Sequence, residues 1–156
     1  MSVPGAAVTL REINADTVRA ICALRVTPAQ EALVAPNAVS IAQAYFEPAA
    51  WFRAICAGDE PVGFAMLYDP TRAVTPERPD TCYLWRFMIA APFQRRQYGN
   101  LALAQLIDHA RGLQGVTRIL LSFVPVDDGP RDFYARAGFR ETGEVDEGEV
   151  VMELVL

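Results

Sequence analysis

The spacing of apolar and polar residues changes along the chain, and these changes predict where strands and helices lie. Apolar residues at every second position indicate half-buried strands, whereas apolar residues three or four positions apart indicate amphipathic helices. On this basis we expect strands at residues 8–13, 51–57, 61–68, 81–90, 119–124, 140–144 and 149–156. We expect helices around Val18 to Cys22 and at residues 29–34, 40–45, 99–113 and 129–137. This order predicts a mixed α/β sheet with helices on both faces.

Turn and capping residues support these boundaries. Residues 58–60, Gly-Asp-Glu, form a short turn between two expected strands, which predicts a hairpin. Asn14 or Asp16 is expected to cap the first helix, and Asp127 or Asp128 the last one. In the middle of the chain a strand, a long helix and a buried strand follow one another, which predicts a right-handed parallel crossover.

The composition is that of a globular protein with one domain. The chain has 156 residues, of which 52% are hydrophobic and 21% charged, so it can bury one core but is too short for two ordinary domains. We therefore expect a single domain over residues 1–156. No apolar run approaches the roughly 18 residues of a membrane helix, and the first residues lack the order of a signal peptide. These features predict a cytoplasmic protein without membrane partners.

Charge and cysteine content narrow the range of partners. The formal net charge is -5, which disfavours nucleic acid and mildly favours a cationic partner. Cys22, Cys56 and Cys82 are odd in number, far apart and set among apolar residues. Such cysteines are expected to be reduced core thiols rather than disulfide partners or metal ligands. The sequence leaves the oligomeric state open, a homodimer included.

The stretch at residues 85–100 carries the strongest functional signal. It is typical of a buried strand, a loop and the start of a helix. Between Pro92 and Gly99 there is no Ser, Thr, Asp or Asn, so no such side chain caps the first backbone N–H groups of the helix. These donors, the positive end of the helix dipole, Arg95 and Arg96 together predict a phosphate site. An ordinary solvated loop is the alternative interpretation of the two arginines.

Two segments resemble a known family. The sequence Gln-Arg-Arg-Gln-Tyr-Gly at residues 94–99 follows the central strand, and Phe-Tyr-Ala-Arg-Ala-Gly-Phe at residues 133–139 lies near the end. With the order of elements, over nearly the whole chain, they resemble the GNAT superfamily of acyl-CoA-dependent N-acyltransferases. This implies a GNAT fold and acetyl-CoA as co-substrate. The phosphate loop of that family reads Q/R-x-x-G-x-G/A, and this chain has Gln97 in place of the first glycine, where a side chain is expected to restrict the backbone or crowd the pyrophosphate.

The resemblance also implies roles for single residues. Backbone amides of the loop would hold the pyrophosphate of coenzyme A, and the residues concerned are Gln94, Arg95, Arg96, Gln97, Tyr98, Gly99 and Asn100. The strand before them, at Phe87, Met88 and Ile89, would pair with the pantetheine and direct an N–H at the thioester carbonyl, where it would stabilise an oxyanion. Tyr134 would protonate the departing thiolate. Asp127 stands where the family often has asparagine, seven residues before that tyrosine.

The two ends of the chain are similar to the bacterial spermine, spermidine and diamine N-acetyltransferases. The similarity lies within residues 12–48 and 138–149. It implies a small cationic amine, in particular a polyamine, as acceptor. Carboxylates and aromatic rings would surround its ammonium groups, and the candidates are Glu31, Glu47, Tyr45 and Trp85. Exposed positions at helix ends are the alternative interpretation of the two glutamates.

Direct attack of the amine on acetyl-CoA in a ternary complex is the expected mechanism. The single histidine, His109, falls on the polar side of its helix, so it is expected at the surface and outside catalysis. Because a primary amine is mostly protonated at neutral pH, a base is needed, and a water relay to Glu31 or Glu47 is expected. Acetylation of a protein amino terminus or of an aminoglycoside is an alternative function. A module that binds acyl-CoA without turnover is another, but it would not need the proton donor Tyr134.

Overall fold

Within residues 7–156, which the computed structural model describes, the chain forms seven strands and four α-helices. The strands are β1 (Val8–Arg11), β2 (Ala50–Ala57), β3 (Glu60–Tyr68), β4 (Thr81–Ile89), β5 (Arg118–Phe123), β6 (Arg140–Asp146) and β7 (Glu149–Val155). The α-helices are α1 (Val18–Ala23), α2 (Asn37–Tyr45), α3 (Tyr98–Arg111) and α4 (Arg131–Arg136). Short 3-10 helices are η1 (Pro28–Gln30), η2 (Pro70–Arg72) and η3 (Ala91–Phe93). No helix in this part of the chain is long and apolar enough to cross a membrane.

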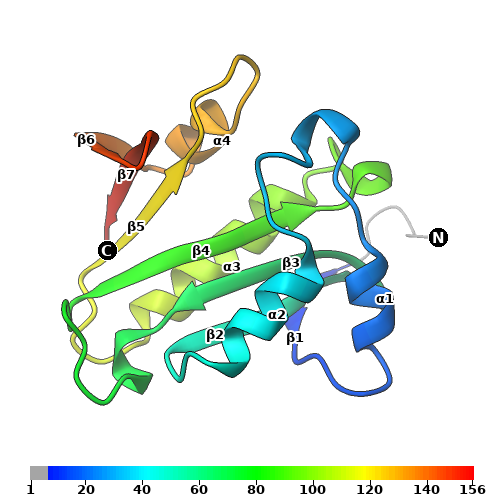
Figure 1. Ribbon diagram of the computed structural model, residues 1–156, viewed down its shortest axis with the longest axis horizontal. Coiled ribbons are helices and arrows are strands. Elements are labelled where there is room, and N and C mark those ends of the chain that lie inside the picture. The colour runs from blue at the N-terminus through cyan, green and yellow to red at the C-terminus, as the bar shows by residue number, and fades with distance from the viewer. Residues whose placement is uncertain (1–6) are drawn as a thin grey trace.

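The strands described here join one mixed sheet in the order β1-β2-β3-β4-β5-β7-β6. Neighbouring strands are antiparallel except for β4 and β5, which run parallel. The long helix α3 connects this parallel pair (Figure 1). The predicted α/β class is therefore confirmed, as are the hairpin of β2 and β3 and the parallel strand-helix-strand connection.

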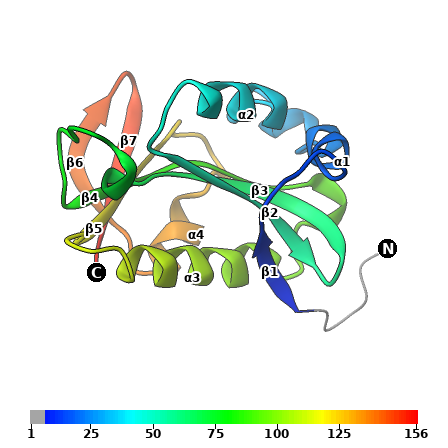
Figure 2. The ribbon, with the colours of Figure 1, turned by 90° about the horizontal axis from the view of Figure 1, so that it is seen from below.

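Helices cover both faces of the sheet and create two cores. Figure 2 shows α1 and α2 on one face, called the α2 face below, and α3 and α4 on the other, the α3 face. The core of the α3 face contains Leu103 and Leu106, which lie on the apolar side of α3. The core of the α2 face contains Ile21 of α1 and Phe64 of β3. The sheet is thus buried on both faces along its central strands.

Two local expectations are wrong. Residues 29–34 form no α-helix. A capping box of Thr27 and Gln30, in which Gln30 Oε1 accepts from the Thr27 N–H at 3.2 Å, starts the single turn of η1, and only turns follow as far as residue 33. Neither Asp127 nor Asp128 caps α4, which begins without a side-chain cap. Asp128 has a left-handed backbone (φ 56°) instead of the extended conformation of an N-cap residue.

The cysteines are free, as expected, but differ in burial. Cys56 and Cys82 are buried, whereas Cys22 is half-buried. Burial raises the pKa of the Cys82 thiol to about 12 and also raises the pKa of Cys56. Thiols in such surroundings stay protonated and are poor nucleophiles at neutral pH.

His109 is half-buried, contrary to the expected surface position. Its ring stacks on Trp51 with ring centroids 4.0 Å apart and an interplanar angle of 18°. The contact arises because His109 falls between the buried Tyr98 and Ala102 on the helical period, at the edge of the apolar stripe of α3, and so it faces the sheet. Burial lowers the pKa of His109.

Candidate active site

The sheet opens between β4 and β5. These strands pair only through residues 81–83 of β4 and 118–120 of β5. Beyond these pairs they diverge, and Figure 1 shows β5 turning away from β4. On its other side β5 stays paired with β7 as far as Phe123. The edge of β4 from Leu84 to Ile89 therefore faces a gap instead of a strand.

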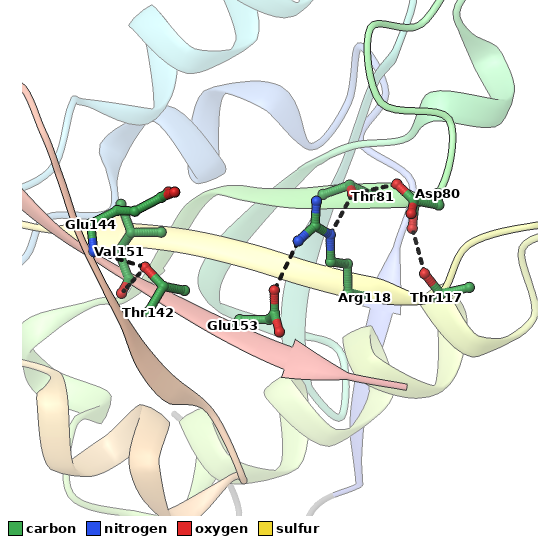
Figure 3. Close-up of polar contacts among 8 residues, drawn as sticks. All are labelled: Asp80, Thr81, Thr117, Arg118, Thr142, Glu144, Val151 and Glu153. Atoms are coloured by element: carbon green, nitrogen blue, oxygen red, sulfur yellow. Dashed lines mark hydrogen bonds and ion pairs between the residues drawn. The ribbon is translucent and has the colours of Figure 1, made fainter.

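Polar side chains hold together the short paired segment of β4 and β5. Arg118, at the start of β5, donates from Nε to the Thr81 hydroxyl at 2.8 Å and from Nη1 to the Glu153 carboxylate at 2.9 Å (Figure 3). The Thr81 hydroxyl donates to the Asp80 carboxylate at 2.8 Å. Arg118 thus links β4, β5 and β7 at the start of the paired segment. The last pair, Tyr83 with Leu120, is the vertex from which the gap opens.

A bulge in β4 turns two adjacent side chains to the same face. Met66 of β3 pairs with Arg86 and the next residue of β3 pairs with Leu84, so Trp85 has no partner in the ladder. Trp85 packs against the core of the α2 face. Arg86 reaches the same face, where its Nη2 donates to the Gln43 Oε1 of α2 at 3.2 Å. An aromatic ring and a cation therefore stand together beside the gap.

A close approach between strands sets which backbone groups of β4 point into the gap. An added Cβ on Gly63 would lie 2.3 Å from the Met88 carbonyl oxygen, so that carbonyl points toward β3. In an extended strand successive residues direct their N–H and C=O groups to opposite sides. Phe87 and Ile89 consequently direct theirs into the gap. The Ile89 C=O accepts from Gln94 Nε2, and the other groups can pair with a ligand along β4.

A cavity of about 1380 Å³ fills the gap. Residues 84–89 of β4 line one side, Ser122 and Phe123 of β5 line the other, and the loop before α3 closes one end. Usual small-molecule pockets hold roughly 300 to 1,000 Å³. The cavity therefore has room for two ligands at once.

The loop at residues 94–97 presents backbone donors at the end of this cavity. Gln97 is the N-cap of α3, and no side chain caps the helix, as predicted. Arg95 and Gln97 have left-handed backbones, with φ of 62° and 68°. The Gln94 side chain turns away from the helix, because its Nε2 donates to the Ile89 C=O and to Gln30 Oε1, both at 2.8 Å. The uncapped N–H groups and the helix dipole together favour an anion here.

Tyr134 of α4 reaches the cavity from the α3 face. Its ring packs with Phe133, Phe123 and Phe139, at centroid distances of 5.2, 6.5 and 5.8 Å. The side chain is buried and also lines the cavity. Burial raises the pKa of Tyr134 above the ordinary range of a phenol. The hydroxyl therefore keeps its proton at neutral pH and can donate it.

Comparison with known proteins identifies the family. The model of the acetyltransferase (GNAT) family matches residues 10–139, which is most of the chain. The chain belongs to the GNAT acetyltransferase family. No curated protein sequence matches it significantly.

Solved structures share this GNAT fold. An acetyltransferase from Thermus thermophilus is 19% identical with a TM-score of 0.76, and the match covers 100% of both chains. The aminoglycoside acetyltransferase AAC(6')-Ib with coenzyme A is 18% identical with a TM-score of 0.75, over 96% of this chain and 95% of that one. N-acetylglutamate synthase from Neisseria gonorrhoeae, with coenzyme A and N-acetyl-glutamate, is 19% identical with a TM-score of 0.70, over 97% of this chain and 35% of that one. At these identities the matches show a common fold.

Most residues expected at a GNAT site line the cavity between β4 and β5. Its lining includes Glu31, Glu47, Trp85, Phe87, Met88, Ile89, Gln94, Arg95, Gln97, Tyr98, Gly99, Asn100 and Tyr134. Three expected residues lie outside this lining. Arg96 and Asp127 are exposed, and Asp128 lines the cavity in place of Asp127. Tyr45 is 85% exposed and packs edge-on against Phe46, away from the cavity.

The sequence did not indicate three polar residues that also line this GNAT cavity. Arg86, Ser122 and Glu149 lie near the vertex, and the Ser122 hydroxyl donates to Glu149 Oε1 at 3.1 Å. Arg86 could not be found because its direction depends on the bulge. Ser122 did leave a signal, since it is the one polar residue in the apolar run of β5.

Proposed function

We propose that this chain transfers the acetyl group of acetyl-CoA to a primary amine of a small cationic acceptor, in particular a polyamine such as spermidine or spermine. The observation that carries the proposal is the position of Tyr134, a buried phenol, at the gap between β4 and β5 and near the uncapped start of α3. One cavity thus contains an anion-binding helix start, the edge of β4 that faces the gap, and a proton donor.

Binding of acetyl-CoA is supported at two places. The pyrophosphate suits the first N–H groups of α3, with Arg95 and Arg96 adding positive charge at the loop. The amide-rich pantetheine arm suits the backbone groups that Phe87 and Ile89 direct into the gap, as an added strand would. GNAT-fold neighbours have been solved with coenzyme A or acetyl-CoA, which agrees with this assignment.

The charge of the cavity lining outside the phosphate loop supports a cationic acceptor. Among the described residues away from α4 and the phosphate loop, the lining carboxylates are Glu31, Glu47, Glu77, Asp146 and Glu149, and the lining arginines are Arg78 and Arg86. The excess of carboxylates attracts ammonium groups, and Trp85 offers a ring face to them. A second cavity of about 530 Å³ shares four lining residues with the first, Arg78, Tyr83, Ser122 and Asp146, and gives room for a longer acceptor. AAC(6')-Ib has been solved with ribostamycin, so aminoglycosides belong in any acceptor screen.

Transfer is expected to be direct, without an acetyl-enzyme. Cys56 and Cys82 are buried, neither lines the cavity, and the raised pKa of each keeps it a thiol. The Tyr134 hydroxyl would give its proton to the thiolate of coenzyme A as the carbon-sulfur bond breaks. A backbone N–H of β4 in the gap would hold the carbonyl oxygen as negative charge develops on it.

Thiol release from acetyl-CoA tests the proposal. Wild type is assayed with spermidine, spermine, putrescine, an aminoglycoside and a peptide, beside Tyr134→Phe. We expect turnover of a polyamine, and a fall of about 10²-fold or more in kcat for the variant with unchanged coenzyme A affinity. The absence of turnover on every amine, with acetyl-CoA still bound, would contradict acetyl transfer and favour a binding module.

A further inference from the structure

Ser122 and Glu149 lie on the α2 face of the sheet, beside the gap. Leu121 and Phe123 belong to the core of the α3 face, so alternation along β5 puts Ser122 on the α2 face. Likewise Val150 packs in the α3-face core, which puts Glu149 of β7 on the α2 face. Here α1 and α2 end over β2 to β4, so this part of the α2 face borders the cavity.

The Glu149 carboxylate is held at the point where the strands have just separated. The last residue of β5 that pairs with β4 is Leu120, and Ser122, just beyond it, donates its hydroxyl to Glu149 Oε1 at 3.1 Å. This bond holds one oxygen of a side chain that lines the cavity. Across the gap, the charge of Glu149 raises the pKa of Arg86, although burial, the larger effect, lowers it. Both side chains line the same cavity, Arg86 from β4 and Glu149 from β7.

Glu149 and Tyr134 approach the gap from opposite faces of the sheet. Tyr134 belongs to the core of the α3 face. In acyl transfer the attacking nitrogen and the departing sulfur both bond to the acyl carbon. A general base is needed near the nitrogen, and a general acid is needed near the sulfur, on another side of that carbon. A thioester lying in the gap would have one such group on each side.

The other cavity carboxylates are less well placed to receive a proton. Glu77, Asp128 and Asp146 are exposed. Glu31 is exposed beyond η1. Glu47 is half-buried, but its Oε1 accepts the Ala49 N–H at 3.0 Å, which directs it back to its own loop. Neither lies on the strands that bound the vertex.

We propose that Glu149 is the general base that deprotonates the acceptor amine, with Ser122 as its positioning residue. This inference rests on the proposed acetyl transfer. Glu149 takes one proton from the ammonium group, the freed nitrogen bonds to the acetyl carbon, and the carbon-sulfur bond breaks as the sulfur takes the Tyr134 proton. The new amide nitrogen loses its second proton through water to the Tyr134 oxygen, and Glu149 releases its proton to solvent.

A comparison of two acceptors tests the role of Glu149. Spermidine is mostly protonated at neutral pH and needs a base, whereas trifluoroethylamine is mostly unprotonated and does not. For Glu149→Gln we expect kcat/KM to fall about 10²-fold or more with spermidine and less than about threefold with trifluoroethylamine. Activity with spermidine should recover as the pH rises toward the pKa of the amine. Ser122→Ala should show the same selectivity with a smaller loss.

Glu147→Gln is the matched control, because Glu147 lies in the same hairpin, is exposed and does not line the cavity. It should leave both acceptors unaffected. Equal losses of Glu149→Gln on both amines, or no loss on either, would overturn the base assignment alone. If wild type acetylated neither amine nor any other, acetyl transfer itself would be wrong, and the base assignment with it. Thermal unfolding of each variant shows whether a loss reflects misfolding.

Discussion

At the scale of the residue, Gly63 controls the position of the strand that faces the cavity. An added Cβ would stand 2.3 Å from the Met88 carbonyl oxygen and 2.9 Å from Ile89 Cδ1. The Met88 carbonyl belongs to the backbone and cannot rotate away as the end of a side chain can. The added Cβ would therefore push β3 and β4 apart. We expect Gly63→Ala to lower the free energy of unfolding by about 3 kcal/mol, as severe overpacking does. Urea unfolding measures this, and calorimetry should show weaker binding of coenzyme A, because the β4 edge shifts.

Gly112→Ala separates this effect from the general consequences of replacing glycine. Gly112 has φ of -80°, and an added Cβ would meet its nearest atom, the His109 carbonyl oxygen, at 3.4 Å. The free energy of unfolding of the Gly112→Ala variant should differ from that of wild type by no more than about 1 kcal/mol. Equal destabilisation by the two substitutions would contradict the importance of the contact at Met88.

The sequence reveals site residues where a motif fixes them and misses those that tertiary structure brings in. Tyr134 and the loop at 94–100 lie in short segments with recognisable spacing, and they line the cavity. Arg86 joins them only because a bulge turns it onto the α2 face. Glu149 joins them because of the register of β7 on β5, which no local pattern encodes.

At the scale of the element, the start of α3 contains a strained residue. Gln97 has a left-handed backbone, which costs a residue with a Cβ roughly 1 to 2 kcal/mol. Its side-chain Oε1 accepts a hydrogen bond from Asn100 Nδ2. We expect Gln97→Gly to raise the free energy of unfolding by about 1 kcal/mol in urea titrations, because glycine adopts this backbone freely. The dissociation constant of coenzyme A should also fall, since the loop loses a side chain that lines the cavity.

Gln97→Ala distinguishes backbone strain from crowding by the side chain. Alanine keeps the strain and loses the contact with Asn100, so the protein should be no more stable than wild type. Stabilisation by alanine equal to that by glycine would show that strain at this position is unimportant.

The elements themselves were mostly predictable, because each long one carries a clear period. The helix expected at 99–113 is α3, and the strand expected at 81–90 is β4, each within two residues of its observed ends. The short segments failed for local reasons. Residues 29–34 carried too few turns for a period to form, and only the single 3-10 turn of η1 is found there.

At the scale of the whole molecule, His109 joins the longest helix to the first half of the sheet. It stacks on Trp51 of β2, and its Nε2 is buried without a hydrogen-bond partner among the described residues. A proton added there has no acceptor and must be desolvated. Burial therefore lowers the pKa of His109, with smaller lowering from Arg53 and Arg72 and an opposing effect of Asp69.

This lowered pKa makes global stability depend on pH in a defined direction. In the unfolded chain a histidine takes up its proton near pH 6.5, whereas the folded protein resists protonation until the pH is lower. The stabilisation is complete above about pH 6.5 and is lost as the pH falls through the folded pKa, with a slope of up to about 1.4 kcal/mol per pH unit. Urea unfolding between pH 8 and 5 should show this loss. His109 is the only histidine, so His109→Phe, which keeps a ring on Trp51, should flatten the profile. An unchanged slope in that variant would place the titrating group elsewhere, among the carboxylates.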